Sequence, residues 1–265
     1  MWNWSHLGIF FALSLLVCLC GFKKYVYFMS IGYGFSVAII GAAMAVMGLL
    51  GSYGTLTLAH YVQFALFIIY GFRLSGFLLI REIKNAAYRK TLAEATGSEV
   101  PVFVKFFMWL TMGVLYVSQT SGVAFRLFNE AGSSAIQWVG IAISAFGIGL
   151  EAIADKQKSA QKAKRPDMVA TEQLYKIVRC PNYFGEILFW TGVTVSCLDC
   201  LKGVGQWITV IIAYILIVFI MFNGAQRLEK RQMARYGSNA EYKAYADKTP
   251  IIIPLLPIYH LNKQN

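Results

Sequence analysis

Polar residues that could carry chemistry gather in three segments in the second half of the chain. The segment 179–186 reads Arg-Cys-Pro-Asn-Tyr-Phe-Gly-Glu, and its proline suits a first helical turn, where a missing N–H costs nothing. Helical spacing brings its polar members near one face: Arg179, Asn182, Tyr183 and Glu186. Apolar residues follow directly, and a carboxylate among them is costly unless it is paired or functional. The segment therefore indicates either a binding site or an Arg–Glu pair that locks two helices together.

The second segment reads Glu-Ala-Ile-Ala-Asp-Lys-Gln-Lys at 151–158. Glu151 and Asp155 share a helix face, where they repel each other and oppose the macrodipole at a helix C-terminus. A partner must compensate for this, such as Arg179 or a polar ligand. Carboxylates of this kind accept hydrogen bonds from ribose hydroxyls or amides. For Asp155, a solvated helix end is the alternative.

The third segment is the tail, where clustered cations stand beside several tyrosines. It contains Lys230, Arg231, Tyr236, Tyr242 and Tyr245, followed by Pro-Ile-Ile-Ile-Pro at 250–254. Such a set can bind a phosphate and stack on or hydrogen-bond a flat ring. An interfacial segment with aromatic anchors is the alternative.

Several familiar sites are absent from the sequence. It contains no GxGxxG, GxxxxGK[ST] or GxSxG string, and its three histidines form no HxxxH pair. Cys197 and Cys200 form one CxxC without a second pair to complete a zinc site. We therefore expect no metal, and a di-iron histidine-box enzyme is excluded.

Composition predicts a membrane protein of the all-α class. Of 265 residues, 57% are hydrophobic and 14% are charged, whereas soluble domains carry roughly a quarter charged residues. Apolar runs long enough to cross a bilayer recur along the chain. We predict a polytopic helical bundle with about seven transmembrane helices: Leu7–Phe22, Tyr25–Leu50, Leu56–Ile80, Val102–Phe128, Ser134–Ala154, Asn182–Leu198 and Val204–Gly224.

The distribution of the net charge of +11 predicts the orientation. Lys and Arg concentrate in alternate connections, at 23–24, 81–105, 156–179 and beyond 227, whereas the remaining connections contain little more than Lys202. By the positive-inside rule, the N-terminus lies outside and the C-terminus lies in the cytoplasm. The basic loops thus face anionic lipid head groups rather than nucleic acid. We expect a multi-pass protein of the bacterial inner membrane, or of the endoplasmic reticulum if eukaryotic.

The segment 179–186 resembles the RHPNYFGE signature of the membrane family that carries the steroid 5α-reductase C-terminal domain. Two further motifs are similar to the bacterial branch of that family: Glu-x-x-x-Asp-x-Gln-Lys at 151–158, and the tail with Leu-Glu-Lys-Arg at 228–231 and Ile-Pro at 253–254. The resemblance covers roughly residues 140–256. It implies one membrane domain over 1–265, with a lipid-substrate half at 1–130 and a cofactor-binding half at 131–256.

The resemblance implies an NADPH-dependent reductase that transfers hydride to the conjugated C=C of a lipid enone, such as a 3-oxo-steroid. Asn182 and Glu186 would hold the nicotinamide end, with Glu186 also catalytic, and Asp155 would contact the nucleotide with Glu151 nearby. Tyr70 precedes Arg73 by three residues and would donate to the substrate carbonyl. The remaining residues expected to bind cofactor are Gln157, Arg179, Tyr183, Lys230, Arg231, Tyr236 and Tyr245, of which Arg179, Lys230 and Arg231 would contact phosphate.

Two departures from the family pattern narrow this expectation. Cys180 replaces the usual histidine, and the predicted second span contains no acid to complete a steroid carbonyl clamp. An alternative is a methyltransferase that uses S-adenosylmethionine, like the isoprenylcysteine carboxyl methyltransferases, which share a Pro-x-Tyr-x-Gly stretch. A transporter or receptor is a third class, but it would scatter polar residues along a membrane-crossing path.

Overall fold

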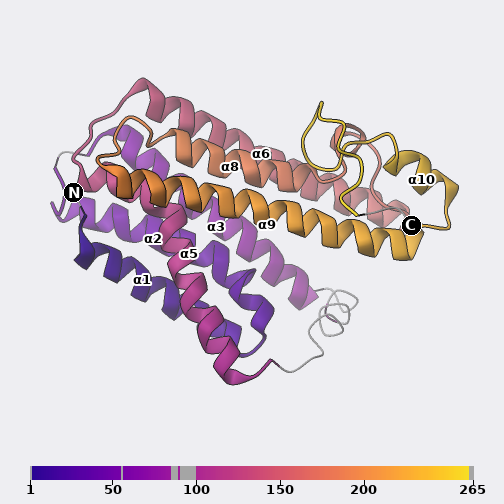
Figure 1. Ribbon diagram of the computed structural model, residues 1–265, viewed down its shortest axis with the longest axis horizontal. Coiled ribbons are helices and arrows are strands. Elements are labelled where there is room, and N and C mark those ends of the chain that lie inside the picture. Colours follow the sequence, from indigo (N-terminus) through magenta and orange to yellow (C-terminus); the bar gives the residue numbers. More distant parts are fainter. Residues whose placement is uncertain (1, 55, 85–88, 90–99, 263–265) are drawn as a thin grey trace. The chain divides into compact units, whose positions relative to one another are not determined.

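Helices make up most of the described part of the chain. The computed structural model describes residues 2–54, 56–84, 89 and 100–262, and no strand occurs among them. Figure 1 shows the helices. The α-helices are α1 (Trp4–Cys18), α2 (Ile31–Leu49), α3 (Leu58–Lys84), α5 (Val102–Phe128), α6 (Ala135–Lys164), α7 (Leu174–Ile177), α8 (Pro181–Val195), α9 (Val204–Tyr236) and α10 (Ala240–Ala246), with short 3₁₀ turns at Leu19–Phe22 and Tyr25–Phe28.

Within the described residues, six helical segments are long and apolar enough to cross a membrane, which confirms the prediction of an all-α polytopic membrane protein. They are Trp4–Phe22, Tyr25–Leu49, Leu58–Lys84, Val102–Phe128, Ala135–Lys164 and Val204–Tyr236. The expected span at 182–198 corresponds to α8, which has 15 residues. At about 1.5 Å per residue, α8 is roughly 22 Å long, less than the hydrocarbon core of about 30 Å.

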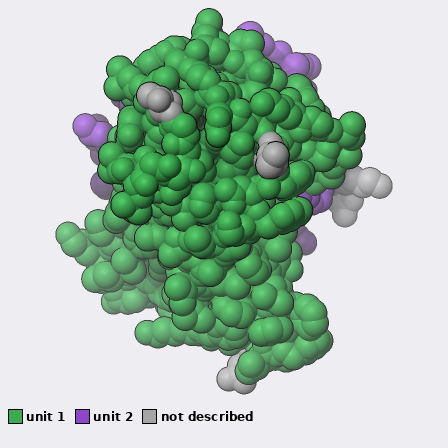
Figure 2. All heavy atoms as spheres, turned by 90° about the vertical axis from the view of Figure 1, so that its left-hand side faces the viewer, with its two compact units in different colours: residues 1–141, 193–213 green, residues 142–192, 214–265 purple. Residues whose placement is uncertain are grey.

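The chain forms two compact units, coloured separately in Figure 2. Unit 1 comprises residues 1–141 and 193–213, and unit 2 comprises residues 142–192 and 214–265. Three helices, α6, α8 and α9, contribute residues to both units.

Small residues bring α2 and α3 into close contact in unit 1. A Cβ atom added at Gly71 would lie 2.1 Å from the Gly34 carbonyl oxygen, so only glycine fits this crossing. Beside it, the Ser75 hydroxyl donates to the Ile31 carbonyl at 2.8 Å. Close backbone approach of this kind is typical of helices packed in a membrane.

A buried arginine holds the C-terminal end of α5 in unit 1. Arg126 donates from Nε to the Ser196 carbonyl at 3.1 Å and from Nη1 to the Gly132 carbonyl at 2.6 Å. Its Nη2 donates to the carboxylate of Asp199. Because all three nitrogens have acceptors, the buried guanidinium is compensated without an external anion.

Candidate functional site

Two glycines set the contact between α6 and α8 in unit 2. A Cβ atom at Gly147 would lie 2.5 Å from the Phe189 nitrogen, and one at Gly185 would lie 2.6 Å from the Glu151 Cγ. The Ser144 hydroxyl donates to the Phe189 carbonyl at 3.0 Å. The missing side chains let the two backbones meet, and this contact leaves room for the Glu151 side chain against Gly185.

Both predicted glutamates are buried beside this crossing. Glu151 is 3% exposed and Glu186 is 4% exposed. The Glu186 Oε1 accepts a hydrogen bond of 3.0 Å from the indole Nε1 of Trp190, one turn further along α8. The crossing therefore places two carboxylates in the interior of unit 2.

Tyr183 lies close to an acid of α6 and to cations of α9. Its ring packs against Gly224, where an added Cβ would lie 3.3 Å from the ring. Asp155 of α6 and Arg227 and Arg231 of α9 are close enough to act electrostatically on its hydroxyl. Asp155 and Asn182 are half-buried, whereas the Arg227, Lys230 and Arg231 side chains are exposed. Unit 2 thus places one carboxylate and two cations near the Tyr183 hydroxyl.

The structure gives Gln157 a contact within the chain. Its Oε1 accepts from the Leu174 N–H at 3.1 Å. One turn later, the Gln161 Oε1 accepts from the N–H groups of Thr171 and Glu172 at 2.9 and 3.0 Å. These two carboxamides shape the connection between α6 and α7.

Arg179 pairs with a carboxylate that the sequence analysis did not single out. Its Nη2 lies 2.8 Å from Oε1 of Glu229 on α9 and also donates to the Tyr259 carbonyl. Its backbone N–H donates to the Pro250 carbonyl at 2.8 Å, and the next N–H, of Cys180, donates to the Ile251 carbonyl at 2.9 Å. The Arg–Glu pair considered as an alternative therefore exists, but its acid is Glu229 rather than Glu186.

Glu229 is the centre of a polar network in the tail. Its Oε2 accepts from the N–H groups of Leu261 and Asn262 at 2.9 and 3.0 Å. His260 lies between two carboxylates, with Nδ1 3.0 Å from Glu229 and Nε2 3.0 Å from Asp247. Glu229 belongs to the Leu-Glu-Lys-Arg motif, which was the only sequence signal for it, whereas nothing in the sequence indicated His260.

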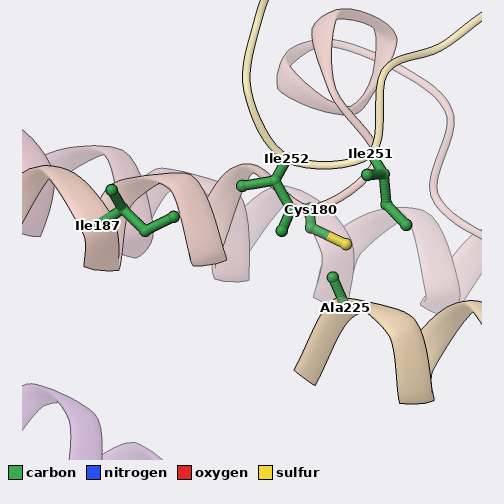
Figure 3. Close-up of a cluster of buried hydrophobic side chains, with 5 residues drawn as sticks. All are labelled: Cys180, Ile187, Ala225, Ile251 and Ile252. Atoms are coloured by element: carbon green, nitrogen blue, oxygen red, sulfur yellow. The ribbon is translucent and has the colours of Figure 1, made fainter. Parts of the chain in front are cut away.

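Figure 3 shows an apolar cluster that α8, α9 and the tail form together. It comprises Cys180, Ile187, Ala225, Ile251 and Ile252, from the start of α8, from α9 and from the tail. Burial raises the pKa of the Cys180 thiol to about 11. The position taken by histidine in the resembling family therefore carries a neutral thiol here at physiological pH.

The predicted tail tyrosines Tyr236 and Tyr245 form hydrogen bonds with other segments of unit 2. The Tyr236 hydroxyl accepts from Lys162 Nζ at 3.1 Å, and the same Nζ donates to the Met168 carbonyl at 2.7 Å. The Tyr245 hydroxyl donates to the Tyr175 carbonyl at 2.6 Å, and burial raises its pKa. Both hydroxyls thus hold protein segments together.

Tyr70 belongs to unit 1 and is fully buried on α3. Its ring centre lies 6.0 Å from that of Tyr33, which in turn lies 5.2 Å from that of Tyr116. Tyr70 is therefore part of an aromatic cluster inside the bundle and does not face lipid.

No group of three or more His, Cys, Asp or Glu side chains that could hold a metal ion occurs among the described residues. Fold and site together define a polytopic membrane protein with a polar centre inside one helical unit. The family described as protein of unknown function (DUF1295) matches residues 22–249, and the chain belongs to this family. No curated protein and no solved structure matches the chain.

Proposed function

We propose that this protein is a membrane-embedded, NADPH-dependent reductase of a conjugated C=C bond in a lipid enone, such as a 3-oxo-steroid. One observation carries the proposal: the buried Glu151 and Glu186 lie on the α6 and α8 sides of the glycine crossing. Buried carboxylates gathered at one helix crossing favour a functional site over a purely structural contact. The resemblance of segments 151–158 and 179–186 to the steroid 5α-reductase C-terminal-domain family supports the same reading.

Unit 2 contains side chains of the types that would suit the separate parts of NADPH. Exposed cations on α9, Lys230 and Arg231, suit phosphate. Half-buried Asp155 suits ribose hydroxyls, and buried Glu186 with half-buried Asn182 suits the carboxamide of the nicotinamide. Because Arg179 is already paired with Glu229, we assign it to positioning of the tail and give the phosphate contacts to α9.

In the proposed reaction, a bound NADPH would supply the hydride that reaches the β-carbon of the enone. The C=C π bond breaks, a proton from solvent completes the α-carbon, and NADP⁺ and the saturated ketone are the products. The Tyr70 hydroxyl would donate to the carbonyl oxygen, which stabilises the negative charge that develops on it. Glu186 would fix the orientation of the nicotinamide.

The charge pattern supports an orientation with the N-terminus outside and the C-terminus in the cytoplasm, where NADPH is available. The segments from 156 to 179 and beyond 227, which hold the proposed cofactor groups, are rich in Lys and Arg. The site would therefore open to the cytosol, and the lipid substrate would reach it from the bilayer.

Full-length protein in lipid nanodiscs provides the test. Progesterone should cause oxidation of NADPH and appearance of the saturated ketone by mass spectrometry, whereas the saturated ketone itself should cause none. NADPH should raise the unfolding temperature, and S-adenosylmethionine should leave it unchanged. Stabilisation by S-adenosylmethionine alone would favour the methyltransferase, and stabilisation by neither would overturn the reductase proposal.

A further inference from the structure

Two buried stripes of the same spacing run along α3 and α5 in unit 1. The α3 stripe is His60, Gln63, Phe67 and Tyr70, and the α5 stripe is Tyr116, Gln119, Val123 and Arg126. Steps of three, four and three residues keep each set on one helix face. All eight side chains are at most 5% exposed, so neither stripe faces lipid.

Two relations, one near each end, indicate that the stripes run antiparallel to each other. At one end, the Arg126 charge acts on the His60 ring. At the other end, the ring of Tyr33 on α2 neighbours both Tyr70 and Tyr116, with ring centres 6.0 and 5.2 Å away. Counting inward from these ends matches Gln63 with Val123 and Phe67 with Gln119. The two glutamines therefore differ in depth by only four residues, roughly 6 Å.

Gln63 and Gln119 are the polar members of the stripes whose carboxamides have no partner in the described part of the chain. Neither Oε1 nor Nε2 of either side chain makes a hydrogen bond there. By contrast, the Tyr116 hydroxyl donates to the Phe28 carbonyl at 2.5 Å, and Arg126 is compensated by Asp199. Two buried amides without partners are costly in a bilayer interior, unless a bound molecule completes their hydrogen bonds.

The side chains around Gln63 and Gln119 favour an uncharged ligand. The Nδ1 of His60 accepts from the Thr57 N–H at 3.1 Å, so the ring carries its proton on Nε2 and is uncharged. Since the Arg126 guanidinium is neutralised as well, the stripes offer no free charge. They offer the Phe67, Tyr70 and Tyr33 rings, which suit a flat apolar body, and two amides that can each donate and accept.

We propose that the α3 and α5 stripes line a binding site for a neutral, membrane-soluble ketone or alcohol with a rigid apolar body, held by the Gln63 and Gln119 carboxamides. This site rests on the proposed function and extends it, because it includes Tyr70. Gln63 and Gln119 would be the residues that select an uncharged substrate. Binding needs no reduction, so it can be measured apart from turnover.

The experiment measures equilibrium binding of tritiated progesterone to the full-length protein in nanodiscs without NADPH. Gln63→Leu and Gln119→Leu keep the approximate side-chain size and remove the hydrogen bonds. Each should weaken binding at least tenfold, while the unfolding temperature without ligand stays equal or rises, since a buried polar group is lost. Gln232→Leu, the same change on α9, is the control and should bind like the wild type.

A second arm tests the choice of a neutral ligand. Unlabelled pregnenolone should compete with progesterone, whereas pregnenolone sulfate, the same body with a charge, should not. Unchanged affinity in both leucine variants, or equal competition by the sulfate, would overturn the site. If a leucine variant fails to fold, Gln63→Asn keeps the amide with a shorter reach and should still weaken binding. Intact binding without NADPH oxidation would instead count against the reductase proposal alone.

Discussion

Arg179 and Glu229 form an ion pair inside unit 2, with 2.8 Å between Nη2 and Oε1 and only 2% and 3% of their side chains exposed. The two residues are 50 positions apart, and the pair joins the start of α8 to α9. Since the same carboxylate accepts hydrogen bonds from Leu261 and Asn262, the pair also fixes the tail.

Removal of either partner should strongly destabilise the protein. Arg179→Met or Glu229→Gln leaves an uncompensated or under-bonded buried group, which typically costs about 3–5 kcal/mol. Thermal unfolding in detergent should show a large decrease in midpoint for each variant. The double variant Arg179→Met/Glu229→Met should lose less than the sum of the two, because no charge is left unpaired.

The exposed pair Arg165–Glu241 is the matched control, with two contacts of 2.9 Å at the surface. Arg165→Gln should leave the midpoint unchanged, since water solvates both groups. Equal losses from the exposed and buried pairs would contradict the role assigned to burial.

The crossing of α6 and α8 should not tolerate a methyl group at Gly185. An alanine Cβ there would lie 2.6 Å from Glu151 Cγ and 2.9 Å from the Gly147 carbonyl oxygen. The backbone of α6 cannot move away without a loss of packing. We therefore expect Gly185→Ala to lower the free energy of unfolding by about 1–3 kcal/mol, the usual penalty of overpacking. Gly149→Ala on α6 meets nothing within 4 Å and should be neutral or stabilising by about 0.5–1 kcal/mol. Thermal midpoints of the two variants measure the contrast.

Cys180 should be unreactive in the folded protein at neutral pH. Burial raises its thiol pKa from the ordinary 9.0 to about 11, and the thiolate is the reactive form. In a variant whose only cysteine is Cys180, N-ethylmaleimide should label slowly until the protein unfolds. Ser238→Cys, exposed and placed in a cysteine-free background, should label rapidly under the same conditions.

The raised pKa of Cys180 predicts how the stability of the protein changes with pH. The unfolded thiol ionises near pH 9 and the folded one near 11, so the unfolded state binds fewer protons between these values. The contribution of Cys180 to stability is therefore complete below pH 9 and decreases as the pH rises toward 11. Cys180→Ala should reduce this alkaline loss, and an identical pH profile in the variant would contradict the assignment.

The fold was largely predictable because its signal is local. Apolar runs located the six long helices of the described residues to within several residues at most ends. The sequence marked Glu151 and Glu186 as carboxylates at costly positions, and both are buried. The partner of Arg179 was not predictable, since contact between residues 179 and 229 depends on tertiary packing. Gln63 and Gln119 were overlooked because they carry no charge, and only charged side chains were weighed for their cost inside the membrane. Their shared three-four-three spacing with aromatic residues was the signal that could have revealed them.

Arg231 tests the assignment of phosphate contacts to α9. Its side chain is exposed and acts electrostatically on Tyr183. Under the proposed function, Arg231→Ala should raise the apparent KM for NADPH about tenfold, leave the KM for the enone unchanged and reduce the salt dependence of cofactor binding. Lys243→Ala, another exposed cation on α10, should change none of these values. An unaltered cofactor KM would remove Arg231 from the site.

Glu186 separates a catalytic role from a structural one. Its Oε1 accepts from Trp190 Nε1, and glutamine keeps an oxygen that can accept this bond, so Glu186→Gln preserves size and local hydrogen bonding. If the carboxylate orients the nicotinamide, turnover should fall by at least a hundredfold while expression and the thermal midpoint stay close to the wild type. Glu172→Gln, at an exposed position, should retain full turnover. A large loss of stability in Glu186→Gln, with NADPH oxidation proportional to the folded fraction, would instead assign the carboxylate to helix packing. Since the buried acid sits at the crossing that carries the proposed function, that outcome would remove its strongest support.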